Sequence, residues 1–422
     1  MLRLAVVALT ALLLLTATGC TQTMDASAHL PKQVDGALPT SVVSELTGAV
    51  TSAVTLAGAS GAVIGVWAPW AGSWTAAPGT TAISGSVPMT TDMHFRIASN
   101  TASMTCTVLL ALVDQGTVAL DDLVTKYLPR MTGLDLITLG DLCRNTSGLG
   151  DYVPTLAPQF VNNPTRQWPA LELITDGLAA PRAGTPGERF SYSNAGIVLL
   201  GMALQAATGK DWNELYRTYI FDRLGMTGTS LPAADDYTLP QPYPRGYATA
   251  LDAAGAPVCG SVVDVTALSP SAGGPASGAV SSLSDLKTYV EALATGVLVS
   301  QASSAEQWKT IPLGAKAPSW EGYGLGAMQF GPLRGYDGEI PGFISAMLTD
   351  PKTGLTVVVV LNNSTSGSDF ARMLALQLAS IASTAPARSG SAPAIALPWS
   401  TKQAADALTG LAVCPPAATP AK

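Results

Sequence analysis

The sequence predicts an α/β (α+β) fold in which an antiparallel sheet is built from both ends of the chain and flanked by helices, with a mainly helical lobe inserted between them. Strand-like apolar runs occur near both ends, whereas the middle carries apolar residues at helical spacing. Hydrophobic residues make up 47 % of the 422 residues and charged residues only 12 %, so a large core is available. We expect a site between the sheet and the lobe, where pockets usually occur.

The N-terminal part is predicted as a helix, a hairpin and a second helix. From Ser41 to about Leu56, apolar residues at helical spacing indicate an amphipathic helix. Segments 61–67 and 72–76 are predicted as two strands that turn at Pro69. The second helix starts at Ser99 and ends near Gly116, a residue type that commonly stops helices.

The middle of the chain is predicted as mainly helical. A short helix ends at 145–149. Longer helices are predicted at 196–208, 212–224 and 284–294. Prolines interrupt the pattern from about 150 to 185, and 228–275 is rich in loop-forming residues, so both segments are predicted as irregular.

The C-terminal part is predicted to return to the sheet. Strands are predicted at 323–326, 342–348 and 355–361. The last of them is a continuous apolar run, which indicates a central strand buried on both faces. A helix over 370–380 closes the domain, which we expect to span 41–385. Residues 386–422 form an Ala/Pro-rich C-terminal tail with one helical segment at 401–411.

The charge and the histidine content argue against nucleic-acid binding and against a metal site. The formal net charge is −7 at pH 7 and no basic run occurs, so we expect no nucleic-acid partner. The chain has only two histidines, His29 and His94, and no Cys-x-x-Cys spacing, so neither a metal site nor another cofactor is predicted. We expect His94 to make a structural polar contact.

Residues 1–20 have the composition of a lipoprotein signal peptide. Arg3 precedes an apolar stretch over 4–15, and Ala17-Thr18-Gly19-Cys20 forms a small-residue cleavage site that ends in cysteine. This ending resembles a bacterial lipobox, which implies lipidation of Cys20; an ordinary cleaved secretory peptide is the alternative. The expected protein is exported and anchored by lipid in the cell membrane, facing the extracytoplasmic side, with 21–40 as a tether.

Four cysteines lie beyond this signal, namely Cys106, Cys143, Cys259 and Cys414. An even number in an exported protein predicts two disulfides, and three pairings are open. Cys106 and Cys143 lie on segments expected to pack beside the site, where a disulfide and two buried free thiols both fit.

The stretch from Phe95 to Ala102 opens the second helix and carries the first chemical motif. Ser99 stands at the amino end of this helix, where free backbone N–H groups and the helix dipole favour a developing oxyanion. An inert helix cap is the alternative role for this serine.

Motif-like residues recur in five segments, which are 95–101, 142–149, 186–194, 271–285 and 338–362. In this order and spacing, they resemble the serine β-lactamase-like family, which includes class C β-lactamases, D,D-peptidases and penicillin-binding esterases. The resemblance covers about 340 residues, from 41 to 380. It implies acyl hydrolysis through the motifs Ser-x-x-Lys, Tyr-x-Asn and Lys- or His-x-Gly.

Carried over by position, the resemblance assigns a role to each matching residue. Ser99 matches the nucleophile, Tyr192 the tyrosine that relays the proton, and Asn194 the amide that orients the substrate. The third motif corresponds to Tyr336-Asp337-Gly338, which implies substrate binding there. The implied oxyanion hole is formed by the backbone N–H groups of Ser99 and Glu339.

The sequence departs from the family pattern twice. Ala102 stands where the family has the lysine of its first motif, and Tyr336 where it has a basic residue. A positioned base contributes about 10²–10⁴-fold, and a phenol with a pKa of about 10 is almost fully protonated at neutral pH. We therefore expect weak or altered D,D-carboxypeptidase- or esterase-type hydrolysis through Ser99, on an ester or amide that lacks a terminal carboxylate.

The alternative is a catalytically dead pseudoenzyme that binds a cell-wall fragment, such as peptidoglycan, or a protein partner in the former active-site cleft. Two other positions carry weaker signals. Ser284-Asp285-Leu286-Lys287 is an intact Ser-x-x-Lys, but it opens a predicted surface helix and is interpreted as a chance match. Arg334 would share a strand face with Tyr336 and supply a positive charge, or remain a solvated residue at the end of the strand.

Overall fold

The computed structural model describes residues 28–252 and 254–415. The predicted signal peptide and its Cys20 lie outside the described residues. Within those residues, no helix is both long and apolar enough to cross a membrane. The same residues contain no cluster of three or more histidine, cysteine, aspartate or glutamate side chains that could hold a metal ion.

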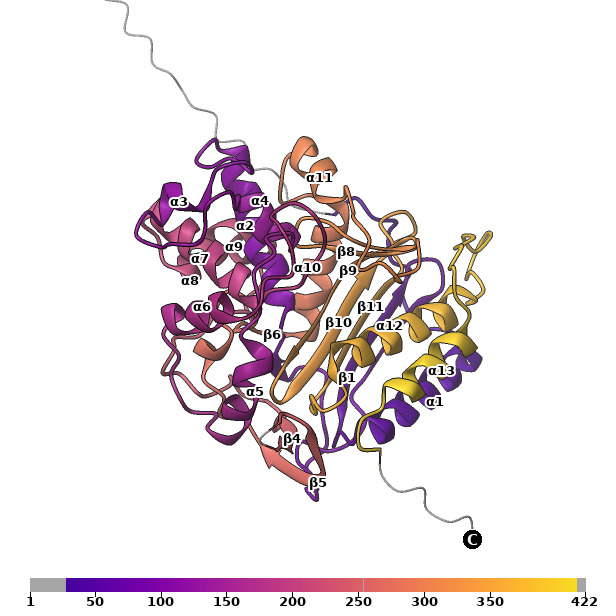
Figure 1. The fold of residues 1–422 in the computed structure, drawn as a ribbon. Helices are drawn as coiled ribbons and strands as arrows, with labels where there is room; N and C mark the ends of the chain where they lie inside the picture. The colour runs from indigo at the N-terminus through magenta and orange to yellow at the C-terminus, as the bar shows by residue number, and fades with distance from the viewer. Residues whose placement is uncertain (1–27, 253, 416–422) are drawn as a thin grey trace, which may run out of the picture.

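A seven-stranded antiparallel sheet is the centre of the fold (Figure 1). Its order is β2-β1-β11-β10-β9-β8-β7. The strands are β1 (Ala62–Ala68), β2 (Gly72–Ala76), β7 (Glu321–Tyr323), β8 (Met328–Phe330), β9 (Leu333–Ile340), β10 (Phe343–Thr349) and β11 (Thr356–Leu361). The two ends of the chain meet where β1 pairs with β11, with Ala62 opposite Leu361. The fold class predicted from the sequence is therefore confirmed, and every residue of β11 is buried, as its apolar run predicted.

Helices cover both faces of this sheet. One face carries α1 (Thr40–Leu56) and α12 (Gly367–Ser383), with α13 (Thr401–Leu411) packed on α12 and α1 (Figure 1). The other carries α2 (Asn100–Asp114) and α10 (Leu283–Thr295). Alternation along β9 distinguishes the faces, because Arg334 bonds to α10 whereas Asp337 bonds to α12. Part of the expected C-terminal tail is thus packed against the helical layer.

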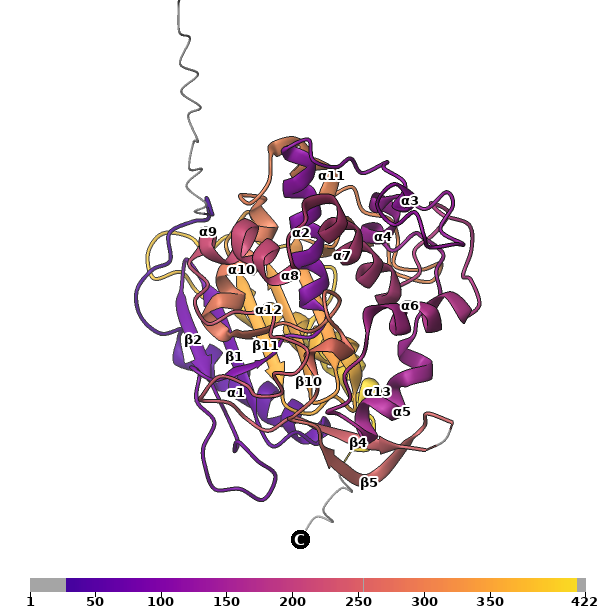
Figure 2. The ribbon, with the colours of Figure 1, turned by 90° about the vertical axis from the view of Figure 1, so that its left-hand side faces the viewer.

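The inserted lobe lies on the α2 side and faces the viewer in Figure 2. It contains α3 (Val124–Tyr127), α4 (Leu139–Arg144), α5 (Val153–Asn162), α6 (Ala170–Ala179), α7 (Asn194–Thr208), α8 (Trp212–Tyr216) and α9 (Asp222–Leu224). A π-helical turn over Arg217–Phe221 joins the last two, and α11 (Gln301–Gln307) follows α10. Two small sheets pair β3 (His94–Arg96) with β6 (Val280–Ser282), and β4 (Tyr247–Leu251) with β5 (Pro257–Asp264).

Two segments predicted as irregular contain regular elements in the structure. Residues 150–185 include α5 and α6, because Pro154 in the first turn of α5 and Pro169 before α6 stand where a fixed φ and a missing N–H are tolerated, although Pro158 lies inside α5. Residues 228–275 contain the β4–β5 hairpin. Its outer strand is exposed almost throughout, so it lacks the apolar alternation from which strands are predicted.

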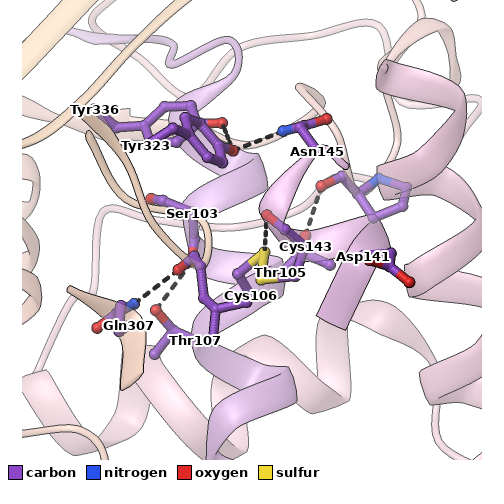
Figure 3. The surroundings of a disulfide bond; sticks show 12 residues. Ser103, Thr105, Cys106, Thr107, Asp141, Cys143, Asn145, Gln307, Tyr323 and Tyr336 are labelled. Atoms are coloured by element: carbon purple, nitrogen blue, oxygen red, sulfur yellow. Dashed lines mark hydrogen bonds between the residues drawn. A yellow bond between two sulfur atoms is a disulfide. The ribbon is translucent and has the colours of Figure 1, made fainter. Parts of the chain in front are cut away.

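The four cysteines form two disulfides, Cys106–Cys143 and Cys259–Cys414. The first joins α2 to α4 and is fully buried (Figure 3). The second joins β5 to the segment that follows α13. The first pair therefore fixes the helix that Ser99 precedes against the lobe.

Candidate active site

Ser99 lies at the floor of a cleft with a volume of about 1010 Å³ between the sheet and the lobe. The turn into α2 is tight, because Ala98 adopts the left-handed conformation with φ of 55°. Asn100 holds this turn to the sheet, since its Nδ2 donates to the carbonyl of Ile97 and to Oγ of Ser345 on β10, both at 2.8 Å. Ser345 Oγ in turn donates to the same carbonyl of Ile97 at 2.9 Å.

Strand β9 approaches the start of α2 very closely at Gly338. A Cβ added to Gly338 would lie 2.3 Å from the backbone nitrogen of Ser99 and 3.0 Å from Cβ of Ala98. Only glycine fits here without a backbone shift. The peptide that leads from Gly338 to Glu339 therefore borders the N-terminus of α2.

Tyr192 lines the same cleft, in the loop before α7. Its hydroxyl oxygen is buried and makes no hydrogen bond of acceptable geometry to any described residue. Burial raises the pKa of Tyr192 to about 12; the neighbouring hydroxyls of Ser99 and Tyr336 oppose this shift, and the carboxylates of Asp151 and Asp337 add to it. A phenol with this pKa is a poor base at neutral pH.

Asn194 begins α7 and points into the site, but its amide is engaged by a carboxylate. Its Nδ2 donates to Oδ2 of Asp151 at 2.9 Å. Burial raises the pKa of Asp151, and the hydrogen bond from Asn194 opposes that shift. Ser193 caps the helix, because its Oγ accepts from the N–H of Gly196 at 3.1 Å.

No cation replaces the missing lysine in the described part of the chain. Ala102 is fully buried in α2, and no hydrogen bond or ion pair of the described residues brings a lysine or arginine to Ser99, Tyr192 or Asn194. The cations that line the cleft are Lys316, which is exposed, and Arg372. Arg372 is already paired with two carboxylates, Asp337 at 3.1 Å and Asp369 at 2.9 Å.

The two leading residues of the third motif point to opposite faces of β9. Asp337 faces α12 and its Arg372. Tyr336 faces the α2 side, is fully buried and does not line the cleft, so its predicted contact with substrate has no surface on which to occur. Its hydroxyl instead lies 2.6 Å from that of Tyr323 on β7 (Figure 3).

The α12 side of the cleft is acidic. Its four acidic lining residues are Glu321, Asp337, Glu339 and Asp369, against the two cations. Burial raises the pKa of Asp337 and of Glu321. The cleft walls also raise the pKa of Glu339 to about 7 by displacing water, although this side chain keeps contact with solvent. An anionic substrate end would be repelled here.

The weaker sequence signals lie elsewhere. Lys287 of the intact Ser-x-x-Lys pairs with Glu291 at 2.8 Å, and neither Ser284 nor Lys287 lines the cleft. Arg334 lies over the ring of Trp308, 4.4 Å from its centroid, and bonds to the carbonyl of Ala294.

Sequence reasoning missed four residues of this site, namely Asn145, Asp151, Tyr323 and Arg372. Asn145 is the left-handed C-cap of α4, with φ of 55° and ψ of 41°. An asparagine at the end of a helix indicates such a cap, but not what its side chain binds. Asp151, Tyr323 and Arg372 each bind a side chain from a different helix or strand, namely Asn194, Tyr336 and Asp337, so no local pattern could identify them.

Comparison with known proteins agrees with this geometry. The family described as Beta-lactamase matches residues 47–380. The D-alanyl-D-alanine-carboxypeptidase/endopeptidase AmpH of Escherichia coli (strain K12) is 35% identical over 151 residues, which cover 34% of this chain and 38% of AmpH. Esterase EstB of Burkholderia gladioli is 28% identical over 172 residues, which cover 38% of this chain and 44% of EstB. The chain thus spans less than half the length of these curated relatives.

Among solved structures, a D-stereospecific amidohydrolase from Streptomyces sp. superimposes with a TM-score of 0.67 and 29% sequence identity, covering 76% of this chain and 94% of that one. The similarity in structure therefore extends over both the sheet and the lobe. Together with the family match over most of the sequence, it shows that the chain belongs to the β-lactamase family.

Proposed function

We propose that this chain is an envelope lipoprotein of the serine hydrolase type that transfers acyl groups through Ser99, slowly and with an altered substrate preference. The observation that carries the proposal is the contact between Gly338 and the nitrogen of Ser99. It suits an oxyanion hole made by the N–H groups of Ser99 and Glu339. A close approach of two backbones beside the serine is needed for this chemistry.

The proposed reaction has two halves. Ser99 Oγ attacks the carbonyl carbon of an ester or amide while its proton passes to the phenolate form of Tyr192, and the two N–H groups bind the resulting oxyanion. Tyr192 then returns the proton to the leaving group as the carbon–heteroatom bond breaks. Water releases the acyl group in a second addition and elimination. Asn194 orients the substrate.

The first half is expected to be slow. The family lysine would favour the phenolate form of Tyr192 by its positive charge, and Ala102 has none. The neighbouring carboxylates of Asp151 and Asp337 act in the opposite direction. Loss of a positioned base costs about 10²–10⁴-fold in rate, which leaves activity only toward activated acyl compounds.

The acidic lining of the cleft supports a particular substrate class. Four carboxylates face the cleft with two cations, one of them paired, so an uncharged or positively charged ligand is favoured over an anionic one. The names of the relatives include a carboxypeptidase, an esterase and an amidohydrolase, all of which cleave acyl bonds. An ester or amide without a terminal carboxylate fits both observations.

A second candidate function is ligand binding without turnover. It is favoured by the bond between Asn194 and Asp151, which occupies the amide that would otherwise orient a lysine. In this alternative, the cleft binds a cell-wall fragment or a protein partner, and Ser99 remains unmodified.

Probe labelling distinguishes the two candidates. Residues 21–422 would be incubated with a fluorescent fluorophosphonate and a fluorescent penicillin, beside Ser99→Ala and Ala102→Lys. We expect slow labelling of the parent by the fluorophosphonate, none of Ser99→Ala, and a gain of about 10²–10⁴-fold in Ala102→Lys. An unlabelled parent with a labelled Ala102→Lys would favour binding without turnover. Absence of labelling in all three proteins would contradict the site assignment.

The anchoring part of the proposal has a separate test. Full-length chain expressed in a bacterium with metabolic fatty-acid labelling should carry the label and sediment with membranes. Cys20→Ser should abolish both, because the thiol at Cys20 is the expected acceptor. A secreted, unlabelled parent would instead support an ordinary signal peptide.

A further inference from the structure

Asn145 binds the loop that carries Tyr192 at the residues directly before and after this tyrosine. Its backbone carbonyl accepts from the N–H of Ser191 at 2.7 Å, and its side-chain Oδ1 accepts from the N–H of Ser193 at 3.0 Å. Because Oδ1 is the acceptor in this bond, the other end of the amide must be the donor. That donor, Nδ2, points to the hydroxyl of Tyr323 at 2.8 Å (Figure 3).

This arrangement sets the direction of the hydrogen bonds that follow. Tyr323 Oη accepts from Asn145, so its own proton needs another acceptor. Among the described residues, its remaining partner is the hydroxyl of Tyr336 at 2.6 Å. If Tyr336 donated instead, the proton of Tyr323 would be buried without an acceptor, which costs about 1–3 kcal/mol. Tyr323 therefore donates to Tyr336.

Tyr336 then has one proton to donate, and Asn145 holds the loop of Tyr192 to the same series through Ser191 and Ser193. Tyr336 and Tyr192 lie close enough for each to perturb the ionisation of the other. Among the described residues, the hydroxyl of Tyr192 has no hydrogen-bond partner, so its oxygen is free to accept. The amide of Asn145 and the hydroxyls of Tyr323 and Tyr336 thus form a series of aligned donors, in which the proton of Tyr336 is not used within the series.

We propose that Tyr336 is a positioning residue which, as the last donor of the series Asn145–Tyr323–Tyr336, stabilises the phenolate form of Tyr192 in place of the absent lysine. This inference rests on the proposed acyl transfer through Ser99. The step it serves transfers one proton: Ser99 O–H and Tyr192 O⁻ become Ser99 O⁻ and Tyr192 O–H, after which the serine oxygen bonds to the acyl carbon. Aligned donors strengthen one another in a buried series.

The charged groups around Tyr192 disfavour its phenolate form, so a donor that favours this form is important. Asp151 and Tyr152, in the loop before α5, lie near Tyr192, as does Tyr323 on β7, whereas Asp337 acts on it from the opposite face of β9. The two carboxylates disfavour a phenolate. Apart from the hydroxyl of Ser99, Tyr336 is the neighbour in the described chain that favours it.

The buried disulfide fixes the start of the series relative to the nucleophile. Cys106 lies seven residues after Ser99, about two turns along the same helix, and Cys143 lies two residues before Asn145. Gly326 packs against this bond, because a Cβ there would lie 2.2 Å from Cβ of Cys106. The helix of Ser99 and the first donor of the series therefore form one rigid unit.

The test measures the ionisation of Tyr192 directly, without a substrate. A ring-fluorinated tyrosine placed at position 192 lowers the phenol pKa into the range where the protein is folded, and ¹⁹F NMR follows its titration. We expect Tyr336→Phe to raise the midpoint by about one pH unit, since a hydrogen bond to a charged group is lost. Tyr323→Phe should shift it in the same direction by less.

Tyr289→Phe is the matched control. Tyr289 is also a fully buried phenol beside α2, but it bonds to Ser103 and Thr107 and has no link to Tyr192. Its removal should leave the midpoint unchanged. If Tyr336→Phe lowers the midpoint, or moves it no more than Tyr289→Phe does, the inference is wrong. If Tyr336→Phe does not fold, Tyr323→Phe takes its place: a raised midpoint supports the inference, and a lowered or unchanged one contradicts it. Failure of the proposed acyl transfer would appear separately, as unlabelled Ser99 with a normal titration.

Discussion

Gly338 on β9 and Ser99 at the start of α2 are in backbone contact, with only 2.3 Å between the nitrogen of Ser99 and the place where a side chain of Gly338 would begin. The atom that a side chain would meet is backbone, which cannot rotate away. Any larger residue at position 338 must therefore separate the sheet from the start of α2, and both stability and the proposed oxyanion hole depend on this one glycine.

We expect Gly338→Ala to lower the free energy of unfolding by about 1–3 kcal/mol, the usual cost of overpacking a tight site. Labelling of Ser99 by the fluorophosphonate should be lost, because the backbone donors separate. The measurements are urea unfolding and probe labelling. Gly410→Ala is the control, since nothing lies within 4 Å of that position in α13. Equal stability of the two variants would contradict the contact.

A second prediction concerns the buried ion pair behind the cleft. The side chains of Arg372 and Asp337 are 13% and 5% exposed, and their atoms lie 3.1 Å apart. Arg372→Met should cost about 3–5 kcal/mol, because it leaves a buried carboxylate without its partner. The double variant Arg372→Met with Asp337→Asn should recover part of that loss. Thermal or urea unfolding measures both.

The control for this pair is Lys402→Met on α13, which removes an exposed partner of Asp406. Surface pairs contribute about 0–1 kcal/mol, so we expect little change. If Arg372→Met were as mild as Lys402→Met, Asp337 would have to be neutral or hydrated in the native protein, and the ion pair would have no role in the cleft wall.

The sequence predicted the helices and strands around this site better than the polar contacts within it. Helix α2, the buried strand β11 and the order of helices and strands follow from local periodicity, which is visible in a single segment. Strand β8 was not predicted, and β9 was expected only as a strand that carries Arg334 and Tyr336, without bounds. Glycine and acidic residues in β9, including Gly335, Gly338 and Asp337, are disfavoured in strands, and packing against α2 and α12 overrides that preference.

The polar contacts of the site could not have been predicted from local patterns. Asn145, Tyr323 and Tyr336 come from α4, β7 and β9, so their hydrogen bonds depend on three segments meeting. The resemblance to the family directed attention to Tyr336 as a substrate contact, whereas the fold buries it completely and keeps it out of the cleft lining. Burial decides the role of a residue at such a position, and burial is a tertiary property.

The two disulfides should differ in their response to reductants. Cys106 and Cys143 are completely buried, whereas Cys259 is exposed on β5 at the rim of the molecule. Thiol exchange needs access to sulfur, so mild reduction should open Cys259–Cys414 first. Alkylation after graded reduction, followed by peptide mass spectrometry, identifies the cysteines that react. Simultaneous reaction of all four would mean that the fold opens before either bond is reached.

Labelling of Ser99 should increase with pH well beyond neutrality. Burial raises the pKa of Tyr192 to about 12, so the phenolate fraction grows as pH approaches that value from below. Each pH unit in this range increases the fraction about tenfold, and the labelling rate should follow between pH 7 and pH 10 wherever the phenolate takes the serine proton. Stopped labelling reactions at each pH, corrected for hydrolysis of the probe, give the rate.

Tyr192→Phe separates this dependence from direct attack by hydroxide or an ionised serine, which also increases with pH but does not need the phenol. Subtracting its rate from that of the parent should leave the tenfold slope. In Ala102→Lys, the new ammonium favours the phenolate, so the increase should begin at lower pH and level off earlier. A parent rate that is already level at pH 8 would show that some other group accepts the serine proton, and Tyr192 would then have no role as the base.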